Sequence, residues 1–217
     1  MNNFVFCHGL GFNPSFWQNL RRYFSEKTSM YIDLGYFSNI NIPSIHNTNI
    51  TIGIGHSLGL TKLLESGIKF EFLIGINSFI NFLGNNEKIR NKRMLEYKAM
   101  IRNFKNNPQT TLDHFYKICG IQPLDTCSLN KEAIFSDLVL LKQSYLLPTT
   151  VPTLIIASKN DLIVPLDLVY DNFQHYHNVN IELIDSSSHV LGFMEPLLVA
   201  SKILSFINGK IKNTYRV

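Results

Sequence analysis

The chain has 217 residues, 45% of them apolar, and a formal net charge of +4. This length suits one α/β domain with a small insertion, and the apolar content excludes a disordered chain. A charge this mild does not indicate nucleic-acid binding, which relies on dense basic patches with interleaved aromatic residues.

Short apolar runs bounded by turns predict six buried strands. They are Phe4–Cys7, Met30–Asp33, Thr51–Gly55, Phe70–Asn77, Pro152–Ser158 and Asn180–Asp185. Helical patterns lie between or after them, at 14–24 (with Phe16, Leu20 and Phe24 on one stripe), at 57–66 and at 195–207, where Gly209 would end the last helix. This alternation predicts an α/β fold with a mostly parallel sheet and helices on both faces.

Residues 81–150 break the alternation, because they show no strand pattern and three helical patterns. The apolar positions of the three patterns are Met94, Tyr97, Ile101 and Phe104, then Leu112, Phe115 and Tyr116, then Leu138, Leu141 and Tyr145. We expect 1–80 and 151–217 to form the core and 81–150 to form a small helical cap over the strand ends, where ligands bind in open α/β sheets. The polar loop 39–49 is too short for a full crossover helix.

The third strand leads directly into the sequence GHSLG at 55–59 and then into a helix. A Gly-x-Ser-x-Gly sequence between a strand and a helix is the signature of a nucleophile elbow, in which a sharp turn exposes the serine. Small residues are needed on either side, and the helix N-terminus favours developing negative charge. We therefore expect Ser57 to be a nucleophile; the alternative is an ordinary glycine-rich turn.

A nucleophilic serine needs a base and an acid, which in this chain order follow it. Of the seven histidines, only His189 stands between a strand end and the last helix. Asp161 follows the fifth strand and is the expected acid. We prefer it to Asp185, which lies only four residues before His189 and would reach the wrong ring face. The expected oxyanion donors are the backbone N–H groups of Leu58 and Leu10.

The cysteines and the N-terminus indicate a compartment. Cys7, Cys119 and Cys127 have no metal-site spacing, and Cys7 lies in an apolar run, as a buried thiol would. The N-terminal residues lack the features of a signal peptide, and no apolar run reaches the length of a membrane span. We expect a reduced, soluble, cytoplasmic and monomeric protein, with no membrane or nucleic-acid partner and no cofactor or metal.

These motifs together resemble the α/β-hydrolase superfamily, with HGLG at 8–11, DLGYF at 33–37 and GHSLG at 55–59, followed by Asp161 and His189. Within it the chain is most similar to the pimeloyl-[acyl-carrier-protein] methyl ester esterases of biotin synthesis. HGLGFNPSFW is similar to their His-Gly-Trp-Gly opening, NNPQTTLDHF to a segment of their cap, and SKNDLIVP and SSSHVLGFMEP to their acid and base loops. Leu10 replaces a tryptophan, and the helix before the elbow strand is nearly absent.

The resemblance implies a serine carboxylesterase that acts on a carrier-bound acyl ester. We expect the acyl group to lie between the sheet edge and the cap, near Trp17, Phe79, Ile80, Val164 and Leu191, although each of these could be ordinary core.

A basic cluster in the cap could dock an acidic acyl carrier protein. Its members are Lys88, Arg90, Lys92, Arg93, Lys98, Arg102 and Lys105, with Glu96 as the only acid among them. Lys88, Arg90, Arg93, Lys98 and Arg102 are the expected docking residues. A solvated helix face, or a site for another anion such as coenzyme A, would explain the cluster equally well.

The same triad would also serve a generic short-chain carboxylesterase, a thioesterase or a carbon–carbon hydrolase, since the preference for a leaving group depends on the cap. A hypothesis from another class is a non-catalytic binding protein with a hydrolase fold.

Overall fold

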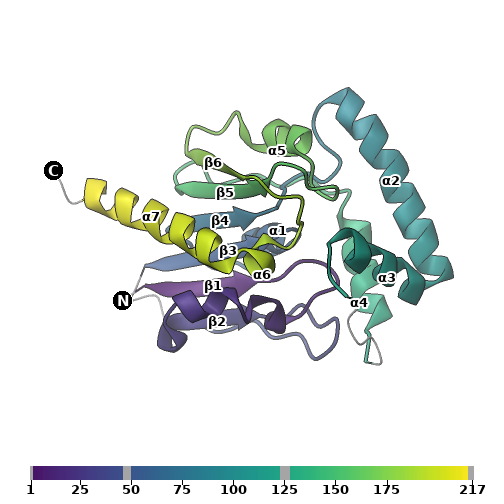
Figure 1. The fold of residues 1–217 in the computed structure, drawn as a ribbon, viewed down its shortest axis with the longest axis horizontal. Coiled ribbons are helices and arrows are strands. Elements are labelled where there is room, and N and C mark those ends of the chain that lie inside the picture. Colours follow the sequence, from purple (N-terminus) through teal and green to yellow (C-terminus); the bar gives the residue numbers. More distant parts are fainter. Residues whose placement is uncertain (1, 46–49, 123–127, 215–217) are drawn as a thin grey trace.

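The computed structural model describes residues 2–45, 50–122 and 128–214, and within them six strands form one fully parallel sheet (Figure 1). The strand order is β2-β1-β3-β4-β5-β6. The strands are β1 (Asn3–Cys7), β2 (Ser29–Ile32), β3 (Thr51–His56), β4 (Phe72–Ile76), β5 (Thr153–Ser158) and β6 (Val179–Ile184). All six predicted strands are confirmed, each within two residues at either end.

Burial on both faces explains why the central strands are apolar along their whole length. Every residue of β3, β4 and β5 is buried, because helices cover the sheet on both sides. The long helix α7 (Pro196–Thr214) packs on one face beside the segment between β1 and β2. The helices α1 (Gly59–Glu65) and α5 (Leu166–Phe173) join β3 to β4 and β5 to β6, which are steps in the same direction across the sheet. Because such crossovers are right-handed, both helices lie on the face opposite α7.

The segment between β1 and β2 is not the single helix that the pattern predicts. It forms three short 3₁₀ helices, η1 (Pro14–Trp17), η2 (Leu20–Tyr23) and η3 (Glu26–Thr28). The Gln18 N–H bonds to the Ser15 carbonyl, three residues back, which is the 3₁₀ and not the α spacing. The predicted stripe is nevertheless buried, because Phe16, Leu20 and Phe24 all face the core.

The last helix continues beyond its predicted end. A short helix, α6 (Leu191–Met194), precedes α7, and α7 runs through Gly209 to Thr214. The prediction of Gly209 as a C-cap is therefore wrong. A Cβ atom at this position would meet nothing within 4 Å, and the backbone is not in the left-handed region, so Gly209 is an ordinary exposed helix residue.

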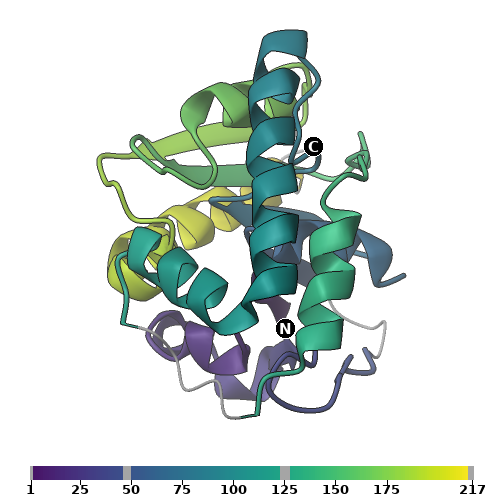
Figure 2. The same cartoon turned by 90° about the vertical axis from the view of Figure 1, so that its right-hand side faces the viewer.

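Three helices between β4 and β5 form a layer beyond the carboxyl ends of the strands (Figures 1 and 2). They are α2 (Glu87–Asn106), α3 (Pro108–Ile118) and α4 (Lys131–Leu140), and α2 packs against both of the others. Asparagine side chains at positions 86, 107 and 130 accept hydrogen bonds from the first turn of each helix, as N-caps do. Tyr145 lies beyond α4, so the third helix is shorter than predicted.

Three further features of the chain follow from the described residues. Between β2 and β3, the described residues 33–45 contain no helix, which agrees with the prediction of a shortened crossover. None of the described helices is both long and apolar enough to cross a membrane. Cys7 is a buried free thiol, as predicted, and Cys127 lies outside the described residues.

An ion pair fastens the helical layer to the core. Asp137 of α4 accepts a hydrogen bond from the Lys62 ammonium of α1 (2.5 Å) and one from the Tyr36 hydroxyl (2.6 Å). Burial alone would lower the pKa of Lys62, but the hydrogen bond and charge of Asp137 outweigh it and raise the pKa. Asp137 is 8% exposed and Tyr36 is fully buried, so neither partner can be lost without leaving a buried polar group unpaired.

We expect Asp137→Ala to lower the free energy of unfolding by about 2 kcal/mol, because it leaves the buried Tyr36 hydroxyl without its acceptor and leaves Lys62 with only the more distant carboxylate of Glu65, at 3.4 Å. Urea denaturation measures this change. Glu132→Ala, an exposed position in the first turn of the same helix, is the matched control and should stay within about 0.5 kcal/mol of the parent chain. Equal stability of the two variants would contradict the assignment.

Candidate active site

Ser57 stands in a strained turn between β3 and α1. Its φ of 53° lies in the left-handed region, which non-glycine residues seldom adopt. A Cβ on Gly55 would lie 2.4 Å from the Leu60 nitrogen, and one on Gly59 would lie 2.1 Å from the Cys7 carbonyl oxygen. Only glycine fits at either position, so the geometry matches the elbow that the sequence predicts.

The two expected oxyanion donors lie on the same pocket as the serine. Leu10 and Leu58 line this pocket together with Ser57. Among the described residues, neither the Leu10 nor the Leu58 backbone N–H makes a hydrogen bond. Two unpaired N–H groups beside a serine are the arrangement that stabilises the oxyanion of a tetrahedral intermediate.

His8 orients the peptide that carries the Leu10 N–H. Its Nδ1–H donates to the Gly9 carbonyl (2.9 Å), which belongs to the same planar peptide unit as the Leu10 nitrogen. The other ring nitrogen, Nε2, accepts from the Leu34 N–H (3.2 Å), and this bond fixes the tautomer. His8 is therefore a structural residue of this loop, occupied at both nitrogens.

The structure brings His189 and Asp161 together. His189 Nδ1–H donates to Asp161 Oδ2 over 2.7 Å, and both side chains are buried. The second oxygen, Oδ1, accepts from the N–H groups of Ile163 and Val164, so the carboxylate is held from both sides. Asp185, the rival acid, is exposed and makes none of these contacts.

The other ring nitrogen of His189 makes no hydrogen bond to Ser57 or to any other described residue. This atom, Nε2, is buried. With Nδ1 donating to Asp161, the neutral ring carries its lone pair on Nε2, which is the nitrogen a general base uses.

Three residues that the sequence analysis missed hold the His189 loop. His56, next to the serine, donates from Nε2 to the His189 carbonyl over 2.9 Å. The Asn77 amide and the Ser158 hydroxyl both donate to the Ser188 carbonyl, at 2.8 and 2.5 Å. Asn77 and Ser158 lie at the carboxyl ends of β4 and β5, and a polar residue at that edge is the signal that could have identified them.

His56 is buried and stays neutral. Its ring stacks on Phe16 with centroids 4.3 Å apart and lies 4.9 Å from the His189 ring. Burial, reinforced by the neighbouring His189, lowers the pKa of His56 well below its usual value. The neutral form leaves Nδ1 without a proton, and that atom has no hydrogen-bond partner among the described residues.

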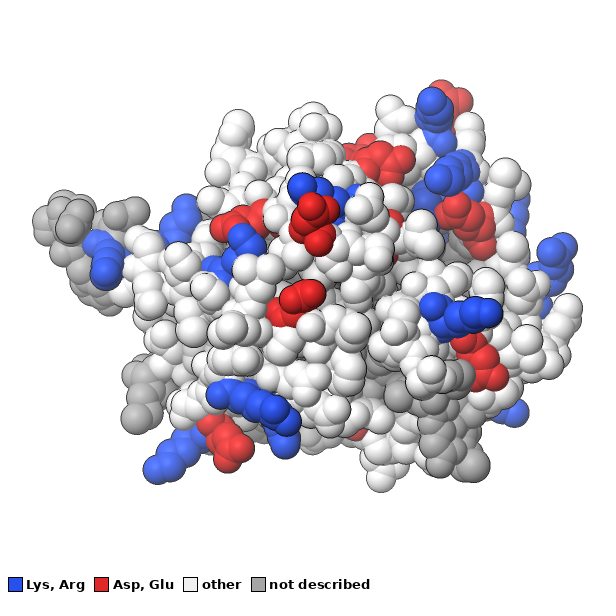
Figure 3. All heavy atoms as spheres, in the orientation of Figure 1, with Lys and Arg blue, Asp and Glu red and all other residues white. Residues whose placement is uncertain are grey.

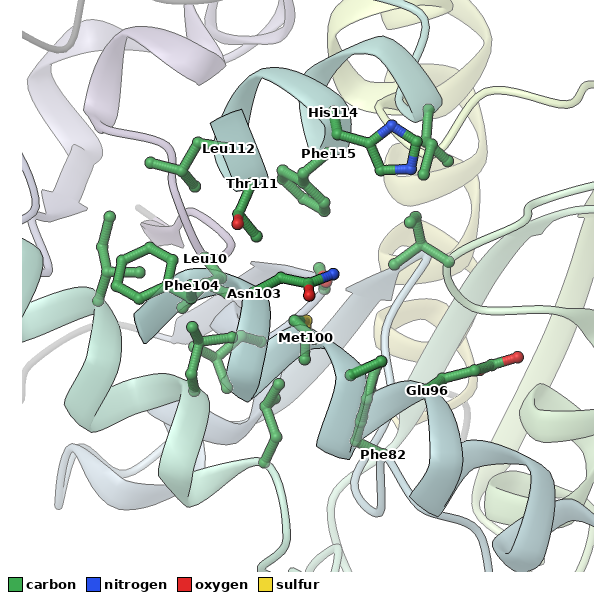
Figure 4. Close-up of a pocket in the computed structure, with 18 of the residues that line it drawn as sticks. Leu10, Phe82, Glu96, Met100, Asn103, Phe104, Thr111, Leu112, His114 and Phe115 are labelled. Carbon is green, nitrogen blue, oxygen red and sulfur yellow. The ribbon is translucent and has the colours of Figure 1, made fainter. Parts of the chain in front are cut away.

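A pocket of about 350 Å³ opens beside Ser57, between the sheet edge and helices α2, α3 and α4 (Figure 4). Its walls are mostly apolar and come largely from the cap. They include Phe82, Met100, Phe104, Leu112, Phe115 and Leu138. Two neutral polar side chains, Asn103 of α2 and Thr111 of α3, point toward the middle of the cavity, whereas Glu96 points away from it.

Of the five residues expected to line the acyl site, only Phe79 lies on this pocket. Trp17, Ile80, Val164 and Leu191 are buried elsewhere, so their prediction as pocket residues is not supported. Trp17, for example, packs against Phe6 and Phe16 inside the core. The pocket faces the cap instead, and its wall depends on helix orientations that a sequence pattern does not specify.

Arg93, predicted as a docking residue, is instead a buried part of the pocket wall. It is 5% exposed, and its guanidinium lies 4.1 Å from the centre of the Phe82 ring. It donates to Glu96 (2.7 Å) and to the carbonyls of Phe82 (3.3 Å) and Ile163 (3.0 Å). Arg93 thus connects the cap to the loop that holds Asp161, and it is not available to a partner protein.

The other expected docking residues are exposed. Arg90 is partly engaged, because its guanidinium donates to the carbonyls of Gly84 and Asn85. Lys88, Lys98 and Arg102 lie on the outer face of α2. Figure 3 shows basic side chains along the edge of the molecule where α2 lies, with acidic side chains beside several of them.

Within the described residues, no group of three or more metal-ligating side chains occurs.

His56 makes stability depend on pH. In the unfolded chain it titrates near its usual pKa of about 6.5, whereas in the folded chain its pKa is far lower, so the unfolded chain binds the extra proton first. The contribution of neutral His56 to the free energy of unfolding is therefore fully present above about pH 6.5. It declines as the pH falls below that value, with a slope that approaches about 1.4 kcal/mol per pH unit.

We expect His56→Gln, which keeps a donor toward the His189 carbonyl, to flatten this decline. Urea denaturation at pH 5, 6, 7 and 8 measures the two slopes. Parallel curves for the parent chain and the variant would show that His56 does not carry the effect.

The sequence matches no protein-family model and no curated protein. Solved structures match over almost the whole chain. An esterase from Exiguobacterium antarcticum superposes with a TM-score of 0.76 at 16% identity, covering 96% of this chain and 92% of its own. A hydrolase from Oleispira antarctica gives 0.72 at 13% identity, with 96% and 91% covered, and MenH from S. aureus gives 0.68 at 16%, with 96% and 94% covered. With its parallel sheet, elbow and helical cap, the chain has the α/β-hydrolase fold.

Proposed function

We propose that this protein is a serine hydrolase that cleaves a carboxylic ester, with Ser57 as nucleophile, His189 as base and Asp161 as the acid that orients the base. The observation that carries the proposal is the strained Ser57 beside two unpaired N–H groups, in a chain that also holds a buried His189–Asp161 pair with a free Nε2. Several of the structural neighbours are esterases, which favours an ester as substrate.

The proposed reaction has two acyl-transfer steps. Ser57 Oγ attacks the ester carbonyl carbon while His189 Nε2 takes its proton, and the carbonyl oxygen becomes an oxyanion bound by the Leu10 and Leu58 N–H groups. The C–O bond to the alcohol then breaks, and the alcohol leaves with the proton from His189. A water molecule, deprotonated by His189, attacks the acyl-enzyme and releases the acid and Ser57.

The pocket favours an uncharged acyl group. Apart from His114, the ionisable side chains on its described lining are Arg93 and Glu96, and these pair with each other. The remaining polar groups near the middle, Asn103 and Thr111, are neutral. A free carboxylate or ammonium on the acyl chain would lose its water here without gaining an opposite charge.

We propose pimeloyl-[acyl-carrier-protein] methyl ester as the specific substrate. Its acyl chain is uncharged, because one end is a methyl ester and the other is linked to the carrier. The exposed cations of α2, with Lys98, Arg102 and Lys105 beside one another on its outer face, would attract an acidic carrier protein. The resemblance of the cap and loop sequences to those esterases is the further support. A generic short-chain carboxylesterase or a thioesterase is the alternative.

We expect a fluorophosphonate probe to label the parent chain and to fail to label Ser57→Ala. Hydrolysis of a p-nitrophenyl ester should fall by at least about 10⁴-fold in that variant, because the nucleophile is lost. Ser78→Ala is the control: this serine is buried at the end of the neighbouring strand and its hydroxyl makes no hydrogen bond within the described structure. Labelling and activity that survive in Ser57→Ala would exclude the mechanism. A parent chain that is neither labelled nor active would favour a binding protein.

We expect the double variant Lys98→Glu and Arg102→Glu to reduce kcat/KM for the carrier-linked methyl ester by about tenfold or more, chiefly by slowing association. Hydrolysis of a free p-nitrophenyl ester should not change, since neither residue lines the pocket beside Ser57. Lys27→Glu, an exposed lysine of η3, is the control. Good cleavage of free esters with none of the carrier-linked substrate would contradict the proposed substrate.

A further inference from the structure

A cap residue makes a direct hydrogen bond to the oxyanion loop, which is the segment 9–12 that carries the Leu10 N–H. The Tyr116 hydroxyl, on helix α3, donates to the Gly11 carbonyl over 2.5 Å, and the two residues are 105 positions apart in the chain. Tyr116 is fully buried. Burial raises the pKa of this phenol, so the hydroxyl keeps the proton that it donates.

The loop is shaped to receive α3. Gly11 has a φ of 73°, and a Cβ on it would lie 3.3 Å from Leu112 Cδ2 and 3.5 Å from the Tyr116 hydroxyl. The next residue, Phe12, packs its ring 5.8 Å from the Tyr116 ring and 5.9 Å from the Phe115 ring, measured between centroids. The helix and the loop thus contact each other through backbone, hydroxyl and rings.

The loop has few internal bonds of its own. Residues 9–12 form a turn closed by the Phe12 N–H on the Gly9 carbonyl at 3.3 Å, a long hydrogen bond. Two of its four residues are glycines, which restrict the backbone least. On the side before Leu10, His8 holds the Gly9 carbonyl. On the side after Leu10, the hydrogen bond from Tyr116 is the corresponding anchor.

We propose that Tyr116 is a positioning residue of the oxyanion hole, which holds the Gly11 carbonyl so that the Leu10 N–H keeps its direction toward the reacting oxygen. The proposal rests on the function proposed above. Tyr116 itself does not line the pocket beside Ser57, so it would act through the loop and not on the substrate directly. An oxyanion donor contributes only if it stays aimed at the place where charge develops, so a looser loop should weaken binding of the transition state more than binding of the ester.

Tyr116→Phe tests the proposal, because it removes the hydroxyl and keeps the ring. We expect kcat for a p-nitrophenyl ester to fall by about tenfold, less than the 10²- to 10³-fold loss for removing a donor outright, with KM within about twofold. An arylboronic acid, which forms a tetrahedral adduct with the active serine, should bind weaker by a similar factor. Hydrogen–deuterium exchange of the peptide that spans residues 9–12 should become faster.

Tyr97→Phe is the matched control. The Tyr97 hydroxyl lies 3.4 Å from the Val139 carbonyl, so it joins two helices of the cap and does not reach the oxyanion loop. This variant should leave kcat, boronic acid affinity and exchange in 9–12 unchanged.

The outcomes separate this proposal from the function it rests on. If the parent chain is active and Tyr116→Phe has the same kcat and the same boronic acid affinity, the positioning role is overturned and the hydrolase proposal stands. A variant that only melts at a lower temperature, with normal kcat, would show a purely structural role and would also overturn it. A parent chain that neither hydrolyses esters nor reacts with a fluorophosphonate would overturn both.

Discussion

The strained backbone at Ser57 is the constraint on which the site depends. A φ of 53° in a serine costs about 1 kcal/mol or more and persists only where the surroundings enforce it. They do so here because β1, β3 and α1 approach so closely that Gly55 and Gly59 leave no room for a side chain. The same close approach brings the loop after β1, with the Leu10 N–H, onto the pocket of the serine. One packing arrangement therefore brings the proposed nucleophile and the proposed oxyanion donors onto one pocket.

The cap contributes to this geometry as well as to the pocket wall. It contacts the oxyanion loop through Tyr116, the acid loop through Arg93 and helix α1 through Asp137. Each contact reaches a segment that carries a different part of the proposed catalytic machinery. Buried polar contacts of this kind demand good geometry at both ends, because a misplaced partner leaves a desolvated group unpaired. The three together fix where the cap stands over the strand ends.

The sequence was sufficient to predict the features that depend on local pattern. Apolar runs located the six strands, the spacing of the glycines located the sharp turn at Ser57, and the chain order led to the two side chains, Asp161 and His189, that the structure joins by a hydrogen bond. The sequence did not predict the features that depend on the orientation of the helices relative to the core. Arg93 looked like one of several surface cations, yet the orientation of α2 buries it against Phe82. The 3₁₀ helices after β1 keep the predicted buried stripe, although they are three short helices with a different hydrogen-bond spacing and not one α-helix.

Because cap residues contribute both geometry and contact surface, a substitution in the cap can alter the proposed catalysis by two routes. Asn103 and Thr111 point into the cavity, and in the described structure neither side chain bonds to a loop that carries a catalytic group. Changes there should act mainly on KM and on the choice of acyl group. Arg93 lies on the pocket wall and also holds the acid loop, so changes there should affect both constants. On the proposed mechanism, substitutions at inward-facing cap positions would therefore change substrate preference, whereas the cap residues that bond to the core would preserve the geometry of the proposed catalytic groups.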